Sequence, residues 1–337
     1  MATLGSTFLT LADWAKRMAP SGGIDEIIEV LASSNPILQD AAVMEGNLVT
    51  GHRSTQRTTL PTGSWRMLNQ GVASTKSTTE QVDDTCGMLE GLSQIDVDLA
   101  ILNGNEAAFR ASEDDAFIAG LSAQAATAII YGNTKLNPEQ MHGFDPRFKT
   151  LGTYVLNGGG AGGTNTSVWI ITWGPKTCHL IFPKGSQAGL KSEDLGKQLV
   201  PDSTLLADSS ATLNRYLAYV TRFQWKLGLA VRDYRYIARV CNVDVALLTG
   251  DASSGADLLD KMIDAFYVRP SADLGNMAKT FVYCNKTVAK FLHKQAMNKS
   301  NVNLSLDNIE GKMVTNFLGA PVHVCDAIHS IEATIGS

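Results

Sequence analysis

The chain has 337 residues and a formal net charge of -5, with 28 Lys and Arg against 33 Asp and Glu. A mildly negative balance argues against a protein whose main task is to grip nucleic-acid phosphates, although it is compatible with lying beside packed DNA without binding it. Hydrophobic residues make up 44% of the chain and charged residues 18%, which excludes a disordered chain. The length suffices for two domains of ordinary size.

The cysteines and the apolar runs indicate the compartment. The five cysteines are far apart, odd in number and without a C-x-x-C pair, which indicates reduced thiols rather than a zinc knuckle or a disulfide framework. The opening lacks the basic segment of a secretion signal, and no stretch approaches the roughly 18 apolar residues of a membrane span. We therefore expect a soluble protein made in a reducing compartment, with no membrane partner.

Residues 1–45 are predicted to form an N-terminal arm of short helices. Residues 24–31 carry an apolar stripe at helical spacing, which Pro36 breaks. Such faces are too small to make a core together. We therefore expect them, with Trp14, to dock on the rest of the chain or on a neighbouring copy.

Residues 46–90 are predicted to be an extended loop made of two β-prone limbs. Thr occurs nine times between residues 46 and 85, where Ile and Phe are absent, so the limbs have little to bury. Pro61-Thr62-Gly63 supplies turn chemistry between them. A lone two-stranded arm is marginally stable in water, so we expect a partner surface. The alternative is a long solvated hairpin with no partner.

The charges of this loop are separated by limb. The outgoing limb carries arginines and the returning limb carries carboxylates, so the two can pair across the arm or with another subunit. Together with Trp14 and Trp65, these charged residues are the candidates for inter-subunit contacts: Arg53, Arg57, Arg66, Glu80, Asp83 and Asp84.

A long helix is predicted over residues 105–131, roughly 40 Å in length at 1.5 Å per residue. Its apolar stripe is narrow and rich in alanine, which favours close contact with another backbone. The members of the stripe recur at steps of three and four: Phe117, Leu121, Ala125 and Ala128. Gly132 is predicted to end the helix in a left-handed cap.

Strands are predicted after the helix. Residues 168–173 and 178–182 are apolar runs divided by Gly174-Pro175-Lys176, which is typical of a hairpin. Residues 219–232 alternate at near-strict period two, which predicts a half-buried strand about 46 Å long. Residues 233–240 alternate again and are predicted to be its return partner.

Residues 251–337 alternate between helical and strand patterns, which is typical of a compact α/β domain. Helical stripes occur at residues 259–266 and 288–292, and strands are predicted at 280–284 and within 311–326.

Two patterns that can carry chemistry are explained by structure instead. The glycines of residues 158–163 satisfy G-x-G-x-x-G, but a dinucleotide site needs a helix after them, and a strand pattern follows here. We predict a flexible turn. His323, Cys325 and His329 could in principle approach a metal, but alternation on a strand followed by a turn explains their spacing.

Three segments carry a resemblance that spans nearly the whole chain. The first is the long helix with its tail Asn137-Pro-Glu-Gln-Met-His-Gly-Phe144. The second is Phe317-Leu-Gly-Ala-Pro-Val-His-Val-Cys-Asp-Ala-Ile328. The third combines Val168-Trp-Ile-Ile-Thr-Trp-Gly174 with Phe223-Gln-Trp-Lys-Leu-Gly-Leu-Ala-Val-Arg232. Together with Leu11-Ala-Asp-Trp14, these segments resemble the major capsid proteins of tailed bacteriophages of the Hong Kong 97 type, in particular a podovirus branch.

The resemblance implies an α+β, Hong Kong 97-like capsid fold. It divides the chain into an N-terminal arm (1–45), an E-loop (46–90), a peripheral domain with the spine helix (91–250) and an axial α/β domain (251–337). In commoner members the peripheral strands follow the Leu-Gly-x-Pro-Val segment, whereas here they precede it. We infer that the same fold is connected in a permuted order.

The resemblance also implies function and partners. The expected protein self-assembles as hexamers and pentamers into an icosahedral shell around a double-stranded DNA genome, with no catalytic residue, cofactor or metal. A separate scaffolding protein and the portal are expected partners, and a decoration protein is left open. Assembly is expected in the host bacterial cytoplasm and the finished protein in the virion capsid. Some relatives cross-link their subunits through an isopeptide bond between Lys and Asn. Lys76 lies in the loop, but no matching Asn and Glu can be identified, so no such cross-link is expected.

Two other function classes remain open. An enzyme with a site assembled from distant residues, such as His179 and Asp233, has no motif in its support. The adjacent Asp114 and Asp115 diverge on the predicted helix, which indicates a solvated edge rather than an acid–base pair. A tail or fibre adhesin would show repeats or β-helical periods, and none is visible.

Overall fold

We describe a computed structural model of the protein that covers residues 35–102, 105–201, 215–248, 258–270, 278–296, 304–309 and 312–336. These residues belong to two compact units, each made of segments far apart in the sequence. The first unit holds residues 88–125 and 189–226, and the second holds residues 35–87, 126–188 and 227–336. The arm helices predicted within residues 1–34, and Trp14 with them, lie outside the described ranges.

Three elements belong to both units: β3 (Thr78–Asp96), α4 (Glu106–Tyr131) and β8 (Arg215–Val231). The division falls in β3 after Gly87, in α4 after Ala125 and in β8 after Lys226. The four contiguous segments implied by the resemblance therefore do not coincide with the compact units, because strands distant in the sequence pair with one another. The four-segment division stays a prediction.

The first unit confirms the long helix and the long strand. The predicted stripe of α4 packs on neighbouring backbone, since a Cβ at Gly91 of β3 would lie 3.5–3.7 Å from Phe117 and Leu121. Phe117 also stacks on Phe223 of β8 at a centroid distance of 6.0 Å. β7 (Leu190–Pro201) pairs antiparallel with β8, and α3 (Val97–Ile101) follows β3.

Two charged residues of α4, Arg110 and Asp114, also face β7 and β8. The guanidinium of Arg110 lies 2.8 Å from Asp194 and 4.7 Å from the ring centroid of Tyr219. Asp114, one helical turn later, is half-buried, and desolvation raises the pKa of its carboxyl group. The predicted solvated edge is therefore wrong for Asp114, because it shares the inward face with Arg110; Asp115 is exposed.

The second unit is built on a sheet with the strand order β11-β12-β13-β10-β5-β6. β9 pairs antiparallel with β5, β4 pairs parallel with β9, and β1 pairs parallel with β6. The elements of this unit, beyond the shared ones, have the following bounds: α2 (Ile37–Asp40), β1 (Val43–Glu45), β2 (Gly51–Thr59), β4 (Val155–Asn157), β5 (Asn165–Trp173), β6 (Cys178–Phe182), β9 (Ile237–Asp244), α5 (Leu258–Val268), β10 (Lys279–Cys284), α6 (Lys286–Ala296), β11 (Leu304–Ile309), β12 (Lys312–Phe317) and β13 (Ala320–Val324). Short 3-10 turns occupy Asp145–Arg147, Tyr234–Tyr236 and Val245–Leu247.

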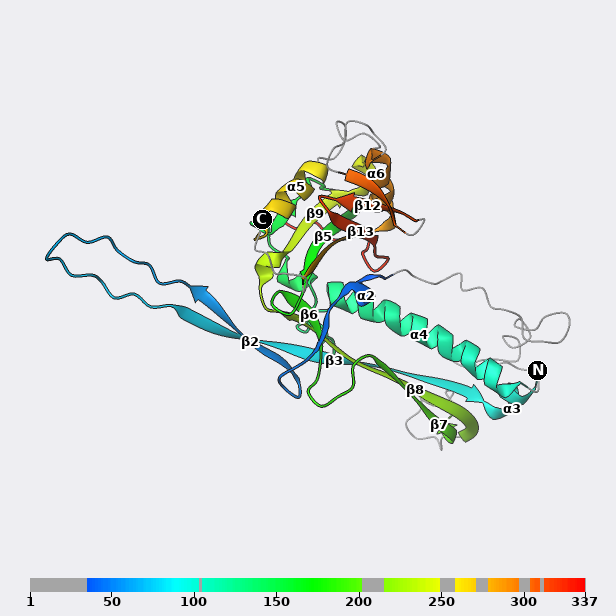
Figure 1. Ribbon diagram of the computed structural model, residues 1–337. Coiled ribbons are helices and arrows are strands. Elements are labelled where there is room, and N and C mark those ends of the chain that lie inside the picture. Colours follow the sequence, from blue (N-terminus) through cyan, green and yellow to red (C-terminus); the bar gives the residue numbers. More distant parts are fainter. Residues whose placement is uncertain are drawn as a thin grey trace. The chain divides into compact units, whose positions relative to one another are not determined.

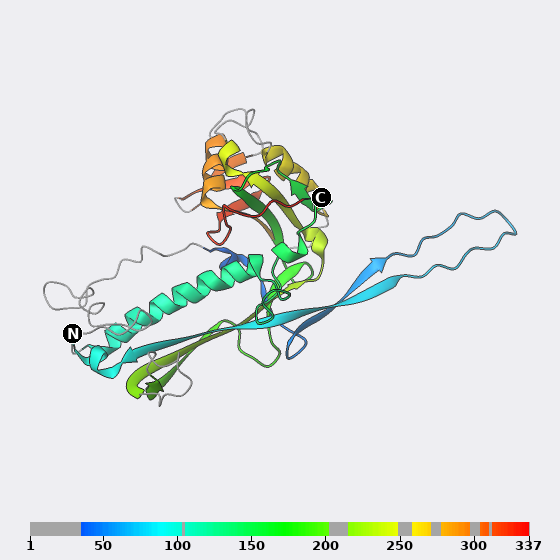
Figure 2. The same ribbon diagram turned by 180° about the vertical axis from the view of Figure 1, so that it is seen from behind.

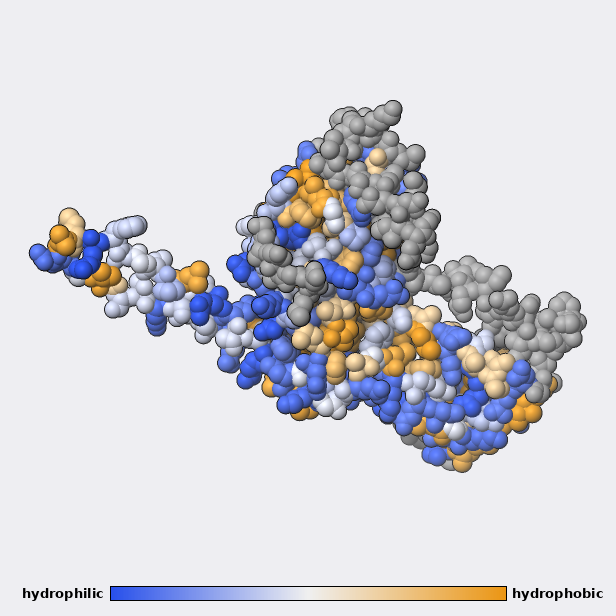
Figure 3. Space-filling view, viewed as in Figure 1, coloured by the Kyte–Doolittle hydropathy of each residue, from blue (hydrophilic) through white to orange (hydrophobic). Residues whose placement is uncertain are grey.

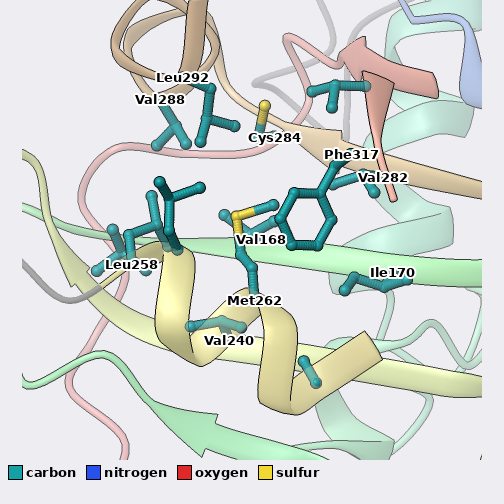
Figure 4. Close-up of a cluster of buried hydrophobic side chains, with 14 of the residues drawn as sticks. Val168, Ile170, Val240, Leu258, Met262, Val282, Cys284, Val288, Leu292 and Phe317 are labelled. Atoms are coloured by element: carbon teal, nitrogen blue, oxygen red, sulfur yellow. The ribbon is translucent and has the colours of Figure 1, made fainter. Parts of the chain in front are cut away.

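Both predicted helices of residues 251–337 cover one face of this sheet. Met262 of α5 and Leu292 of α6 are fully buried in a single apolar cluster with Val168 of β5 and Val282 of β10. Figure 4 shows these side chains pointing toward one another. Helices and strands alternate in this region as predicted, but they share one core with β5 and β9, which lie before residue 251.

Two predicted strand pairings are wrong. β5 and β6 do not form a hairpin, since they meet only at Trp173 and Cys178, and both edges of β5 are occupied by β9 and β10. Residues 233–240 do not return along β8. Asp233 accepts a hydrogen bond from the backbone N–H of Arg235 and starts a 3-10 turn, which leads the chain into β9 against β5.

The end of α4 also differs from the prediction. Gly132 is not among the described glycines with positive φ, so it does not form a left-handed cap. It allows close backbone contact instead, since a Cβ there would lie 2.4 Å from the carbonyl oxygen of Ala128 and 2.5 Å from that of Met141. The tail after the helix folds back, and the N–H of Gly143 donates to the carbonyl of Gly132 at 2.8 Å.

A buried charge cluster lies on the face of the sheet opposite α5 and α6. Arg239 of β9 is 1% exposed, and its guanidinium lies 2.7 Å from Asp145 and 3.0 Å from Glu332. It also stacks over Trp169, 4.6 Å from the ring centroid. Glu332 accepts a further hydrogen bond from the Tyr131 hydroxyl at 2.5 Å. The cluster thereby ties the C-terminal segment to the sheet and to the end of α4.

The cysteines and the possibility of a membrane-spanning helix are the other features considered from the sequence. All five cysteines lie in the described ranges, and each is a free thiol. Burial raises the pKa of the Cys86 and Cys325 thiols to about 11, so they are protonated at neutral pH. Within the described residues, no helix is both long and apolar enough to cross a bilayer.

Candidate inter-subunit surface

The predicted extended loop is an antiparallel arm. β2 pairs with the first part of β3 from Gly51 opposite Thr85 to Arg57 opposite Thr79, and a β-bulge follows before Thr59. Figures 1 and 2 show residues 60–77 as an open, extended loop beyond these strands. Hydroxyl groups close the strand end, since the side chain of Thr78 lies within 2.7 Å of those of Thr58 and Thr59. Polar contacts therefore hold the arm together where little apolar surface is available.

One of the predicted cross-limb charge pairs forms within the chain. Arg53 faces Asp83 in the strand register, and its Nε and Nη2 atoms donate to the two carboxylate oxygens at 2.6 Å each. This bidentate geometry is the strongest form of an arginine–carboxylate pair. Both side chains are about half exposed, so solvent screens the pair and its contribution to stability is small.

Asp84 is not part of the exposed surface. It is 3% exposed, its Oδ1 atom lies 2.7 Å from Nη2 of Arg147, and its Oδ2 atom accepts from the N–H of Val231 at 3.2 Å. The prediction that Asp84 is exposed for contact with another subunit is not met within this subunit, because Asp84 fastens the base of the arm to its own chain. Side chains alternate along β3, so Asp83 points to the other face and reaches Arg53.

Two histidines pack beside the same base. The rings of His52 on β2 and His179 on β6 meet edge to face with centroids 5.6 Å apart, and His179 is fully buried. Desolvation, with further contributions from His52 and Arg232, lowers the pKa of His179 to about 4. The neutral ring is therefore the form that the folded protein accommodates.

This burial predicts a loss of stability in acid. Because the folded pKa lies below the ordinary value of 6.5, the stabilising contribution is complete above pH 6.5 and is lost as the pH falls toward 4. The lost free energy of unfolding is up to about 3 kcal/mol. The substitution His179→Leu should flatten this pH dependence, measured by urea unfolding of the unassembled subunit between pH 7 and pH 4. An unchanged slope would contradict the assignment.

The loop of residues 60–77 exposes apolar side chains. Trp65 is fully exposed, and Leu68 is 92% exposed; Figure 3 shows apolar residues along this loop. The chain reverses at Met67–Gln70, where Asn69 has a φ of 64° and the N–H of Gln70 donates to the carbonyl of Met67. The turn predicted at Pro61-Thr62-Gly63 is therefore wrong, because Asn69 tolerates the left-handed conformation and the reversal occurs there.

The other predicted contact residues are left facing outward. Arg57, Arg66 and Glu80 are on the arm and form no ion pair within the described part of the chain, although Arg66 donates to the carbonyl of Gln70 at 3.1 Å. The sequence reasoning missed the apolar neighbours of Trp65. They could have been recognised as apolar residues in a stretch otherwise rich in Thr, Ser and Gly: Leu60, Met67, Leu68 and Val72.

The patterns considered for chemistry do not converge. The glycines of residues 158–163 form a turn that leads into β5, with the Gly158 N–H donating to the carbonyl of Cys241. His179 lies against His52, whereas the carboxylate of Asp233 pairs with Arg235 at 2.8 Å, so the two residues named for a distant enzyme site have separate partners. No cluster of potential metal ligands occurs among the described residues.

The side chains of the segment considered for metal binding, residues 323–329, are engaged elsewhere. His323 bonds Asp40 at 2.6 Å, the Cys325 thiol contacts the side-chain oxygen of Asn35, and the His329 ring stacks on Tyr131. The first two contacts join this segment to residues 35–40, and the third joins it to the end of α4. Their role in the structure is packing and anchoring.

Comparisons with known proteins identify relatives of the chain. A chain in the structure of bacteriophage Epsilon15 is 39% identical, with 98% of each chain covered and a TM-score of 0.77. The SrpI encapsulin complex from Synechococcus elongatus matches at 10% identity over 70% of this chain and 97% of that one, with a TM-score of 0.45. The capsid of a native GTA particle matches at 8% identity over 72% and 95%, with a TM-score of 0.42. No curated protein matches.

The family assignment follows from a model that describes the major capsid protein GP7 and matches residues 19–336. With the Epsilon15 similarity, it confirms a podovirus-type major capsid protein of Hong Kong 97-like fold that forms a phage capsid shell. This family is one of structural capsid proteins. The permuted order of the fold stays a prediction. The chain belongs to the major capsid protein GP7 family.

Proposed function

We propose that the arm formed by β2, β3 and the loop of residues 60–77 joins each subunit to a neighbouring copy in the shell. The observation that carries this proposal is the full exposure of Trp65 at the loop. A tryptophan that packs against other residues buries about 150–250 Å² of surface, and Trp65 does not bury this surface within its own subunit. Clustered apolar residues on a surface mark sites of interaction. A second copy supplies the missing cover in a protein whose function is to assemble with itself.

The assembly proposal extends to the particle and its other components. The shell is icosahedral, is made of hexamers and pentamers, and encloses the double-stranded DNA of a tailed bacteriophage. A separate scaffolding protein directs assembly in the host cytoplasm, a portal occupies one vertex, and a decoration protein is an optional addition. The family and the Epsilon15 similarity support these partners by analogy. Lys76 in the loop takes no part in a covalent cross-link.

Trypsin tests the role of the arm. Arg57, Arg66 and Lys76 are exposed cleavage sites along it, and an open loop is a preferred site of nicking. We expect the free subunit to be cut at these sites within minutes and the assembled shell to resist cleavage at least tenfold longer. Mass spectrometry of the fragments locates the cuts.

The comparison of cleavage in the free subunit and in the assembled shell needs an internal standard. Lys135 is exposed outside the arm, and its cleavage rate in free and assembled protein reports how far the shell itself excludes the protease. Arm sites cut at the same rate in both states, while Lys135 becomes protected, would overturn the proposal.

A further inference from the structure

The two helices of the second unit lie over opposite edges of the sheet. α5 packs over β9 and β4, whereas α6 packs over β13, β12 and β11. Figure 1 shows α5 beside β9 and α6 beside β12. Their buried sides meet the same core, as Figure 4 shows. Their outer sides therefore form two separate flanks of one compact body.

The outer side of α5 is acidic. Asp260 and Asp264 are exposed and one helical turn apart, and Tyr267 continues the same face with 74% exposure. The one basic residue of the helix, Lys261, lies 3.9 Å from Asp264 with both side chains largely in solvent, a pair that contributes little. The two carboxylates are spaced about 6 Å apart along the axis.

The outer side of α6 is basic. Lys286, Lys290 and Lys294 are exposed and lie at steps of four, so they share a face and repeat about every 6 Å. The helix contains no acidic residue. Lys290 and Lys294 flank the ring of Phe291 at 5.8 and 5.5 Å, and Lys286 lies 3.1 Å from Asp326.

This arrangement does not favour the helix in isolation. Like charges four residues apart on a helix repel each other and destabilise it. A lysine in the first turn also opposes the helix dipole, and Lys286 holds that position. An acidic surface placed against α6 would offset these repulsions with attractions between opposite charges. The acidic flank over the opposite edge of the same sheet has the required charge and spacing.

We propose that the acidic flank (Asp260, Asp264 and Tyr267 of α5) of one subunit packs against the basic flank (Lys286, Lys290 and Lys294 of α6) of the next subunit within a capsomer. Two different, complementary surfaces on one molecule form a head-to-tail contact, which closes into a ring when the rotation between copies allows it. The inference rests on the proposed hexamers and pentamers and adds the surfaces that join their members. The charges set the order and register of the ring.

Charge reversal with rescue tests the pairing. The double variant Lys290→Glu/Lys294→Glu and the double variant Asp260→Lys/Asp264→Lys each place like charges across the contact, and each should lose at least nine-tenths of the particles formed by the unchanged chain with its scaffolding protein. The quadruple variant restores opposite charges in reversed order and should recover at least half of them. Particles are counted by sedimentation and electron microscopy.

A matched control distinguishes loss of the proposed contact from a general effect of the changed net charge. Lys135→Glu/Lys184→Glu makes the same charge change at exposed lysines outside both flanks and should assemble normally. Assembly lost in this control, or not recovered in the quadruple variant, would overturn the pairing. Normal assembly of Lys290→Glu/Lys294→Glu with reduced DNA content would overturn it too, and would assign the lysines to nucleic acid.

A disulfide cross-link between the two flanks tests directly whether they meet in neighbouring subunits. With Asp264→Cys and Lys290→Cys in one chain, oxidation of assembled particles should give a ladder on a non-reducing gel that ends at the pentamer and hexamer. Each single cysteine variant should remain a monomer on the same gel. If the unchanged chain forms no particles, the proposed function fails before this test. If particles form and the ladder is absent, only the flank pairing fails.

Discussion

The double substitution Trp65→Ser/Leu68→Ser is expected to abolish shell assembly while leaving the subunit folded. Both side chains are almost entirely in solvent, so their removal changes the free energy of unfolding by no more than about 0.5 kcal/mol. At an interface, by contrast, a buried tryptophan is a typical hot spot whose truncation costs about 2 kcal/mol or more. The loss recurs at every subunit, so a modest change per contact removes the particle.

The experiment compares assembly with folding in the same preparation. Sedimentation velocity measures the fraction of protein in particles, and circular dichroism during thermal unfolding shows that the unassembled subunit retains its structure. The control Val49→Ser/Leu136→Ser removes two similarly exposed apolar side chains outside the loop and should assemble as the unchanged chain does. Particles from the loop variant at unchanged yield would refute the role given to Trp65.

The substitution Arg239→Met is expected to destabilise the subunit by about 3–5 kcal/mol, because removing one member of a buried ion cluster leaves its partners without compensation. Arg239 is 1% exposed and bonds Asp145, Glu332, the Ser167 hydroxyl and the carbonyl of Phe148. Methionine fills much of the volume but satisfies none of these acceptors. The C-terminal segment, held through Glu332, should loosen first.

Urea unfolding of the unassembled subunit measures this effect, and hydrogen exchange reports whether residues 329–336 lose protection before the rest. Arg235→Met is the matched control, because its pair with Asp233 lies at 2.8 Å with the arginine 54% exposed. A surface pair contributes about 0–1 kcal/mol. Equal destabilisation by the two substitutions would show that burial of Arg239 is not the cause.

Periodicity in the sequence predicts elements better than it predicts their partners. The stripe around Leu121 placed α4 within one residue of its observed bounds, and the alternation after Tyr219 placed most of β8. The neighbours of β5 come from β9 and β10, far along the chain. A hydrophobic pattern records which face of an element is buried, and it carries no label for the segment that buries it.

The same limit applies to the candidate surface. Opposite charges on the two limbs were enough to predict pairing across the arm or with another subunit, and the register of the strands brings Arg53 opposite Asp83 within the arm. The burial of Asp84 depends on Arg147, 63 residues away, and no local pattern signals that contact. The loop could be predicted as extended, and Leu68 could have been recognised as an apolar residue in a polar stretch, but its 92% exposure follows only from the structure.

The bonds of Asp40 limit when a newly synthesised subunit can complete its folding. Its carboxylate accepts from Tyr283 at 2.9 Å and bonds His323 at 2.6 Å, and nearby Asn35 accepts from the N–H of Ala327. The segment around Asp40 is synthesised early, but its bond to His323 cannot form until β13, one of the last strands, has been synthesised. Contacts so distant in the sequence form slowly, and these cannot form before residues 320–327 have been translated.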